Sequence, residues 1–280
     1  MSDLRSDLER IDRRPYGFYK DLRGRSYAVG TYTLRLDHVQ GDPFAAPSRV
    51  RVEVPAEVPR LPAEALADAD ARRASADYLQ RVLVRTLSSS RRRSGSGKSG
   101  LLEVAALGQE MLDRTGVSVG ESGALCIRLF AGLPASGRRI LGHEAASLLV
   151  DLLPELLDST ISSNSINAGE LMLHVEALQD QVALRAQLTH EGLVAFLAEG
   201  SILPRRSGAD DRPLRDAVPL ECPSSLEREL RTPHSGTIRG LGIPAGVTLI
   251  VGGGYHGKST LLSVLALGVY DHIPGDGRER

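Results

Sequence analysis

Alternating hydrophobic and polar positions stand out in two segments near the start of the chain. Ser26 to Leu36 and Arg49 to Val54 place apolar side chains at every second position. A period of two predicts strands that bury one face and expose the other. A third strand is expected at Leu125 to Phe130. The first half of the chain is therefore expected to contain a sheet.

Longer patterns with a period near 3.6 predict helices around these strands. Residues 1 to 20 are expected to form a charged helix followed by a turn near Pro15. The other predicted helices are Ala63 to Ser88, His143 to Leu157 with an interruption near Pro154, and Ala168 to Glu199 as one or two amphipathic helices. The leucines of the last segment are more simply core residues than ligand contacts: Leu171, Leu178, Leu184 and Leu188. Ile202 to Leu214, rich in Pro, Gly and charge, is expected to be a loop.

The pattern changes near the end of the chain, where a short apolar run precedes a glycine-rich loop. Val247 to Val251 is β-branched and apolar and is bounded by glycines, which predicts a strand buried on both faces. Leu261, Leu262 and Leu265 then follow at helical spacing. A strand, a loop and a helix in this order form the context that a phosphate-binding loop requires.

The loop itself reads G-x-x-x-x-G-K-S from Gly252 to Ser259, the pattern of a nucleoside-triphosphate site. Free N–H groups at the start of the next helix and the helix dipole favour an anion there. Lys258 is expected to reach the outer phosphates of ATP, and the Ser259 hydroxyl to bind Mg2+. The candidate nucleotide contacts are Gly252, Gly253, Gly254, Tyr255, His256, Gly257, Lys258, Ser259 and Thr260. The alternative is a glycine-rich turn without a ligand.

Lysine usage supports the functional interpretation. Only Lys20, Lys98 and Lys258 among the 34 basic residues are lysines, and two of them stand in the tripeptide Gly-Lys-Ser. A phosphate loop needs a compact ammonium group on a flexible stem, which the planar guanidinium of arginine does not replace. An accidental motif in this arginine-rich chain would more often carry arginine. By the same argument Lys20 can be more than a surface charge, although its role stays open.

A second basic segment surrounds Lys98. Ser88 to Gly100 reads SSSRRRSGSGKSG, which by itself predicts a flexible, serine-rich loop. It is not a second phosphate loop of the same type, because Arg92 occupies the position of the first glycine. Its glycines could form an anion-binding nest for a nucleic-acid backbone or a nucleotide, and a solvated linker is the alternative. The candidate residues of this second anion site are Arg91, Arg92, Arg93, Gly95, Gly97, Lys98, Ser99, Arg138 and Arg139.

The loop from Asp37 to Ser48 is another candidate. Its Asp37, His38, Gln40 and Asp42 could form a polar site. Such loops are more often turns that are capped by their own Asp side chains. Both interpretations are open at the level of sequence.

Overall composition limits the classes of partner. The 34 basic residues nearly balance the 35 acidic ones, so any nucleic-acid contact is expected from a local patch. No signal peptide is visible, and no apolar run approaches the roughly 20 residues that span a bilayer. Cys126 and Cys222 are solitary, which suits a reducing cytosol and argues against a structural zinc site. We therefore expect a cytoplasmic protein without a membrane contact.

Motifs spread over nearly the whole chain suggest a family. They start at His38 (HVQGDPFAAPSRVRV), Gly95 (GSGKSG), Gly108 (GQEMLDRTGV), Gly132 (GLPASGRRILG), Gly200 (GSILPRRSG) and Gly246 (GVTLIVGGGYHGKSTLL, continuing through GVYDHIPGDGRE). With these motifs the chain resembles the predicted ATPases of the ABC class, a family with its own N-terminal domain and no transporter membrane segments. Together the motifs are far more specific than the phosphate loop alone.

The resemblance implies an α/β chain with an N-terminal α+β domain at 1–165 and the start of a P-loop, ABC-type nucleotide-binding domain at 166–280. It implies that the Walker A site for ATP and Mg2+ consists of Gly252, Gly254, Gly257, Lys258, Ser259 and Thr260. ABC ATPases also need a glutamine loop, a signature helix, a Walker B strand and a switch histidine after Walker A, yet the last residue, Arg280, follows Lys258 by 22 residues. We expect a truncated chain that binds ATP without hydrolysing it and contains no identifiable catalytic residue. The intact protein is expected to dimerise through its nucleotide domains.

Two functions fit these features. The first is an ATPase whose closure around ATP acts on a macromolecular partner, RNA or a ribonucleoprotein, through the basic loops. Few aromatic residues are available for base stacking, so contacts to the RNA backbone are favoured over sequence reading. The second is a nucleotide-gated scaffold that contacts proteins and no nucleic acid. A GTPase is disfavoured because no lysine follows an asparagine, as the N-K-x-D motif would require.

Overall fold

The computed structural model describes residues 3–90 and 95–279 and divides into two compact units. Unit 1 comprises Met1–Ala67, Ser75–Ala106 and Asp113–Ala168, and unit 2 comprises Asp68–Ala74, Leu107–Leu112 and Gly169–Arg280. The chain therefore enters unit 2 twice before its long C-terminal part. None of the helices in the described ranges is long and apolar enough to cross a membrane.

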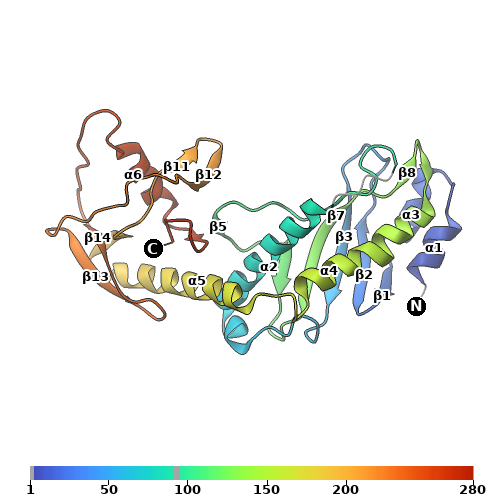
Figure 1. The fold of residues 1–280 in the computed structure, drawn as a ribbon, viewed down its shortest axis with the longest axis horizontal. Helices are drawn as coiled ribbons and strands as arrows, with labels where there is room; N and C mark the ends of the chain where they lie inside the picture. Colours follow the sequence, from blue (N-terminus) through green and yellow to red (C-terminus); the bar gives the residue numbers. More distant parts are fainter. Residues whose placement is uncertain (1–2, 91–94, 280) are drawn as a thin grey trace. The chain divides into compact units, whose positions relative to one another are not determined.

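A six-stranded antiparallel sheet forms the centre of unit 1 (Figure 1). Its path runs through β1 (Ser26–Val29), β2 (Tyr32–His38), β3 (Ser48–Val54), β7 (Leu125–Ala131) and β4 (Leu102–Glu103), and β6 (Val117–Val119) also pairs with β7. The three predicted strand segments are confirmed. The first of them is two strands, because Gly30, at φ 59°, and Thr31 make the two-residue hairpin that a right-handed sheet twist favours.

Helices cover one face of this sheet, as Figure 1 shows. They are α1 (Leu4–Arg10), the unit 1 part of α2 (Ala69–Ser89), α3 (Gly142–Ala146) and α4 (Leu153–Ile161), with short 3-10 helices at Tyr16–Leu22 and Ala63–Leu66. The strand residues beneath them, such as Leu34, Val52 and Ile127, are almost fully buried. The alternating residues of the same strands point to the opposite face, where arginines predominate.

The helical segment that follows Leu141 changes its hydrogen-bonding pattern partway along. A π-helical segment, Ser147–Leu152, joins α3 to α4, and Pro154 lies in the first turn of α4. In the π-helical segment the Leu153 N–H donates to Leu148 O, so the hydrogen-bond register changes just before Pro154, which has no N–H to donate. The predicted interruption near Pro154 is therefore confirmed, as a change of helical pitch.

Unit 2 packs a long helix on a small antiparallel sheet. The helix α5 (Ala168–Leu188) lies on three strands in the order β10 (Leu193–Ala198), β14 (Gly236–Pro244) and β13 (Glu227–Thr232). Leu184 of α5 meets Ala198, Leu230 and Ile238 in a buried cluster. The remaining elements of unit 2 are β5 (Glu110–Met111), which pairs with β15 (Asp271–His272), the hairpin of β11 (Arg205–Ser207) and β12 (Asp210–Pro213), and α6 (Lys258–Leu267).

Two predictions for unit 2 are wrong in part. The helix expected to reach Glu199 ends at Leu188, and a turn that includes Gly192, at a positive φ of 67°, leads the chain into β10. The loop expected at Ile202 to Leu214 contains the β11–β12 hairpin, in which Asp210 binds the Arg212 guanidinium at 2.6 Å. The Arg212 hydrogen bond lowers the pKa of Asp210 to about 2. The segment is thus a short charged hairpin, although its composition suggests an irregular loop.

Asp180 of α5 fixes the turn between β13 and β14. Its buried carboxylate accepts hydrogen bonds from the backbone N–H groups of His234, at 2.9 Å, and Ser235, at 3.0 Å. Asp180→Ala is expected to lower the free energy of unfolding by about 2 to 3 kcal/mol, because both buried donors lose a charged acceptor. Hydrogen exchange should accelerate at these two amides. Asp180→Asn, which keeps one oxygen, should lose about half as much stability, and equal stability of all three proteins would contradict the assignment.

Candidate functional site

The glycine-rich loop ends where α6 begins. Gly257 is the N-terminal cap of α6 with φ 78°, a left-handed conformation that favours glycine, and the first helical hydrogen bond runs from Leu261 N to Gly257 O at 2.9 Å. In the described part of the chain no side chain caps this helix. The N–H groups of its first turn have no intrahelical acceptor and are available to an anion.

Lys258 closes over the loop. Its ammonium group donates to the carbonyl oxygens of Gly252, at 2.7 Å, and Gly253. A β-carbon on Gly253 would lie 3.3 Å from the imidazole of His256, so the loop is tight on this side. The Ser259 side of the first helical turn is exposed. The lysine, the hydroxyl and the first-turn amides therefore belong to one small surface.

Tyr255 adopts a positive φ of 64°, which is uncommon for a residue other than glycine. Its side chain is fully exposed, as are most of the loop residues. The loop is therefore held by its own backbone and by Lys258 rather than by burial.

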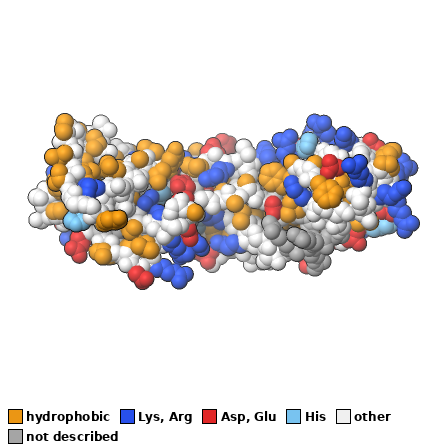
Figure 2. Space-filling model, turned by 90° about the horizontal axis from the view of Figure 1, so that it is seen from above, with side chains coloured by type: hydrophobic (Ala, Val, Ile, Leu, Met, Phe, Trp, Pro, Cys, Tyr) orange, Lys and Arg blue, Asp and Glu red, His pale blue; other side chains and the backbone are white. Residues whose placement is uncertain are grey.

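The strand predicted at Val247 to Val251 does not form. The segment has no strand conformation, and Val247, Leu249 and Val251 are 103%, 82% and 75% exposed. Figure 2 shows hydrophobic side chains on the surface of unit 2, which lies at the left of the view. A strand buried on both faces needs hydrogen-bonded neighbours and covering layers. The described residues provide neither beside this segment.

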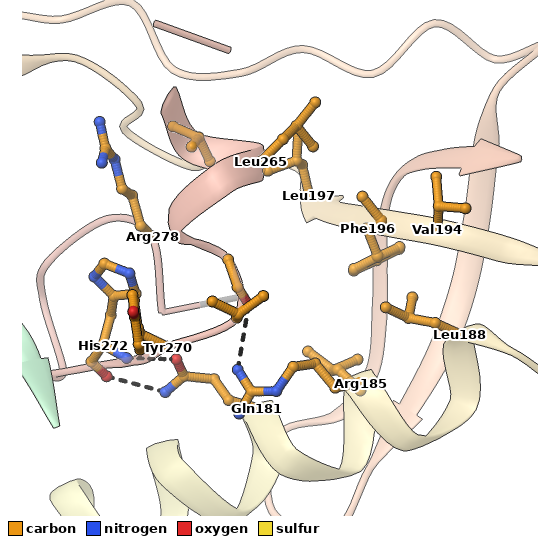
Figure 3. Close-up of a pocket in the computed structure, with 15 residues that line it drawn as sticks. Gln181, Arg185, Leu188, Val194, Phe196, Leu197, Leu265, Tyr270, His272 and Arg278 are labelled. Carbon is orange, nitrogen blue, oxygen red and sulfur yellow. Dashed lines mark hydrogen bonds between the residues drawn. The ribbon is translucent and has the colours of Figure 1, made fainter. Parts of the chain in front are cut away.

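The second half of α6 rests on an apolar cavity of about 170 Å³ within unit 2 (Figure 3). Phe196 and Leu197 of β10, Leu188 of α5 and Leu265 of α6 point into it. Its polar edge includes the Arg278 guanidinium, whose pKa is lowered by burial. The cavity lies along the helix beyond its first turn and is a packing feature of α6.

The segment after α6 is fixed by buried charges. Asp271 pairs with Arg185 and, at 2.9 Å, with Arg73, while the Gln181 amide bonds the backbone N–H and C=O of His272 at 2.7 and 2.9 Å. Asp276 binds Arg205 at 2.6 Å. Sequence reasoning did not single out these residues. The only signal in the sequence was the pair Asp271 and Asp276 in a short glycine-containing motif. The arginines that pair with them are distant in sequence and could not be identified from it.

The structure describes one part of the second predicted anion site. Arg91, Arg92 and Arg93 lie outside the described residues. Gly95, Gly97, Lys98 and Ser99 form a hydrogen-bonded turn in which the N–H groups of Ser96, Lys98 and Gly100 bind backbone oxygens at 2.7 to 2.9 Å. These three amides are thus not available to an anion. The Lys98 side chain is exposed, and it forms no ion pair with the residues that the structure describes.

Three loops meet at this end of unit 1. Lys98 N donates to Pro43 O, Ser96 N donates to Ala135 O, and the Ser99 hydroxyl accepts from Ala135 N at 3.0 Å. The last of these loops includes the short pair β8 (Ala135–Ser136) and β9 (Arg139–Ile140). Arg138 and Arg139 are exposed there, and Arg139 donates to Arg13 O at 3.2 Å. The structure thus brings Lys98, Arg138 and Arg139 onto one set of connected loops.

The polar loop from Asp37 to Ser48 is held by internal bonds. Asp42 accepts from the N–H groups of Phe44 and Ala45 at 2.8 and 3.1 Å, as a capped turn does. Gln40 is buried and exchanges hydrogen bonds with Ser48, and Asp37 pairs with Arg51 at 2.8 Å. The structural interpretation of this loop is therefore favoured.

Comparisons with known proteins match both parts of the chain. A family model described as "ATPase of the ABC class N-terminal" matches residues 1–164, and an ABC_ATPase P-loop domain model matches residues 167–280. An uncharacterized protein of Methanocaldococcus jannaschii is 37% identical over 108 residues. This alignment covers 36% of the present chain and 24% of the relative, so the chain spans a small part of the relative's length.

Gly132 permits the closest approach between the loops of unit 1. A β-carbon at this position would lie 1.7 Å from the Lys98 carbonyl oxygen, so the backbone would have to move. Gly132→Ala is expected to lower the free energy of unfolding by about 3 kcal/mol, as overpacking against fixed backbone does. Gly17→Ala, which meets nothing within 4 Å, is the matched control and should change it by less than about 1 kcal/mol. Urea denaturation measures both, and equal values would contradict the close contact.

Proposed function

The chain belongs to the ABC-class ATPases, and we propose that its Gly252–Thr260 loop binds Mg-ATP. The observation that carries this proposal is the uncapped start of α6, where first-turn amides, the Lys258 ammonium and the Ser259 hydroxyl share one surface. Phosphate groups are the ligands that such a surface favours, because N–H dipoles and a cation face the same anion.

Each group has a role in this proposal. The glycines let the backbone approach the phosphates, and Lys258 exchanges its two carbonyl acceptors, Gly252 and Gly253, for phosphate oxygens. Ser259 binds Mg2+, which neutralises phosphate charge. We assign no catalytic residue in this chain. We propose that hydrolysis requires two nucleotide domains, which enclose ATP as a homodimer.

We further propose that closure around ATP acts on an RNA or ribonucleoprotein partner in the cytoplasm. The exposed Lys98, Arg138 and Arg139 on connected loops support this, because cations on ordered loops suit a phosphate backbone. The two free cysteines, Cys126 and Cys222, suit a reducing compartment. The alternative is a nucleotide-gated scaffold, in which the same loops contact a protein. A nucleotide-dependent dimer without RNA affinity would favour that alternative.

Titration with fluorescent Mg-ATP tests the nucleotide site. Lys258→Ala is expected to weaken binding at least tenfold, because it removes the cation that meets the outer phosphates. Lys98→Ala is the matched control, since both lysines stand in Gly-Lys-Ser, and it should leave the affinity unchanged. Equal loss in both variants would mean that the two loops serve one nucleotide. Unchanged binding in Lys258→Ala would contradict the proposed site.

The RNA partner is tested with a variant in which Arg91, Arg92 and Arg93 are all alanine. Affinity for single-stranded RNA should fall, and the slope of log affinity against log salt should shrink by about 0.7 for each lost phosphate contact. Arg85→Ala, an exposed arginine on α2, is the matched control and should retain both values. An unchanged affinity and slope in the triple variant would exclude these arginines as the RNA contact.

A further inference from the structure

Arginines from three neighbouring strands form a row on the open face of the unit 1 sheet. Arg35 of β2 stands opposite Arg51 of β3, which stands opposite Arg128 of β7. Side chains directly opposite each other have β-carbons about 5 Å apart, and like charges in such positions are destabilising. The fold therefore retains a like-charge contact that costs stability.

Carboxylates offset only part of this charge. Asp37 pairs with Arg51 at 2.8 Å and with Arg35 at 3.4 Å, and the Arg51 pairing raises the pKa of that guanidinium. Within the described ranges, Arg49 and Arg128 have no carboxylate within ion-pair distance, and the Arg128 guanidinium donates to the Thr115 carbonyl at 2.9 Å. Two other acidic residues, Glu53 and Glu103, share this face at its far end and its edge.

The same side chains line a groove of about 580 Å³. Its floor is the sheet face with Asp37, Arg49, Arg51, Arg128 and Phe130, and one wall is formed by Ala105 together with Thr115 and Gly116. All of these residues belong to unit 1. The two guanidinium groups without carboxylate partners thus face into a concave site.

Phe130 gives the groove an aromatic surface. It stands opposite Arg49 in the pairing of β3 with β7, and it is 37% exposed although phenylalanine is usually buried. The chain has few aromatic residues, so an exposed ring with Arg49 opposite it on one side and Glu103 on the other is unusual here. A nucleobase stacks on such a ring, while guanidinium groups beside it bind the flanking phosphates.

The groove lies next to the basic loops. The pair Ser48 and Ala131 ends the ladder just beyond Arg49 and Phe130, and the chain then enters the loop in which Gly132 exchanges backbone bonds with Gly100 and Leu101. Lys98 is part of that contact network. Backbone bonds and the pairing of β4 with β7 therefore connect the loop of Lys98 to the end of the groove at Phe130.

We propose that this groove binds single-stranded nucleic acid, with phosphates on Arg49 and Arg128 and one base stacked on Phe130. The proposal rests on the proposed function, in which RNA is the partner, and it names the surface that holds the strand. Charge complementarity selects a polyanion, and the exposed ring selects one with accessible bases. A paired duplex hides its base faces and fits this site less well.

Fluorescence anisotropy with a labelled uridine oligomer of about ten nucleotides tests the proposal on the whole chain. The double variant Arg49→Ala, Arg128→Ala should lose affinity about tenfold and reduce the salt slope by about 1.4, for two phosphate contacts. Phe130→Ala should also lose about tenfold with the salt slope unchanged, because stacking releases no counterions. Phe130→Tyr keeps the ring and should restore binding, and Arg85→Ala is the control for charge alone.

The outcomes separate this inference from the RNA partner itself. If the unmodified chain binds the oligomer and the groove variants bind equally well, the groove is excluded as the binding surface. The proposal of an RNA partner is then unaffected. If the unmodified chain binds no oligomer at any salt concentration, the groove proposal and the proposal of an RNA partner are both wrong. Equal binding of a duplex of the same length, or equal competition by polyglutamate, would also overturn the groove. Mg-ATP affinity, measured in each variant, should stay unchanged if the variants are folded.

Discussion

The constraint on which the nucleotide site depends is the set of backbone N–H groups that a helix cannot satisfy by itself. The first turn of α6 has such donors, and Gly257 provides no side chain to cap them. Lys258 adds a cation that bonds to the loop carbonyls of Gly252 and Gly253 and forms no ion pair with the described residues. An anion at this point would satisfy the donors and give the cation a partner of opposite charge. The site is thus defined by unmet hydrogen-bonding capacity at a helix end.

The rest of unit 2 holds that helix end in place. One side of α6 packs through Val264 toward α5 and β10, and the following segment is fixed by the pairing of Asp271 with Arg73 and Arg185. Buried charge pairs cost desolvation and tolerate little displacement, so they fix geometry more than they add stability. The arrangement suits a loop that must keep its shape while its own residues are exposed.

Local patterns predicted much of this structure. The alternation in Arg49 to Val54 and Leu125 to Phe130 found the central strands, and the glycine and lysine spacing found the start of α6. Val247 to Val251 failed as a strand because burial on both faces depends on neighbouring elements, which one segment cannot report. The row of arginines was also missed. Each arginine occupies the polar side of a predictable strand, but their alignment depends on register between strands far apart in sequence.

The tripeptide Gly-Lys-Ser occurs twice, and its surroundings decide what each copy can bind. At Lys98 the N–H groups of Ser96, Lys98 and Gly100 donate to carbonyl oxygens of Ala135, Pro43 and Gly132, so these amides cannot meet an anion together with the side chain. At Lys258 the amides belong to an uncapped first helical turn and can act together with the ammonium group. Side-chain contacts alone bind an anion weakly and lose strength in salt, whereas oriented amides define its position. The same three letters therefore specify a cationic surface in one unit and a shaped phosphate site in the other.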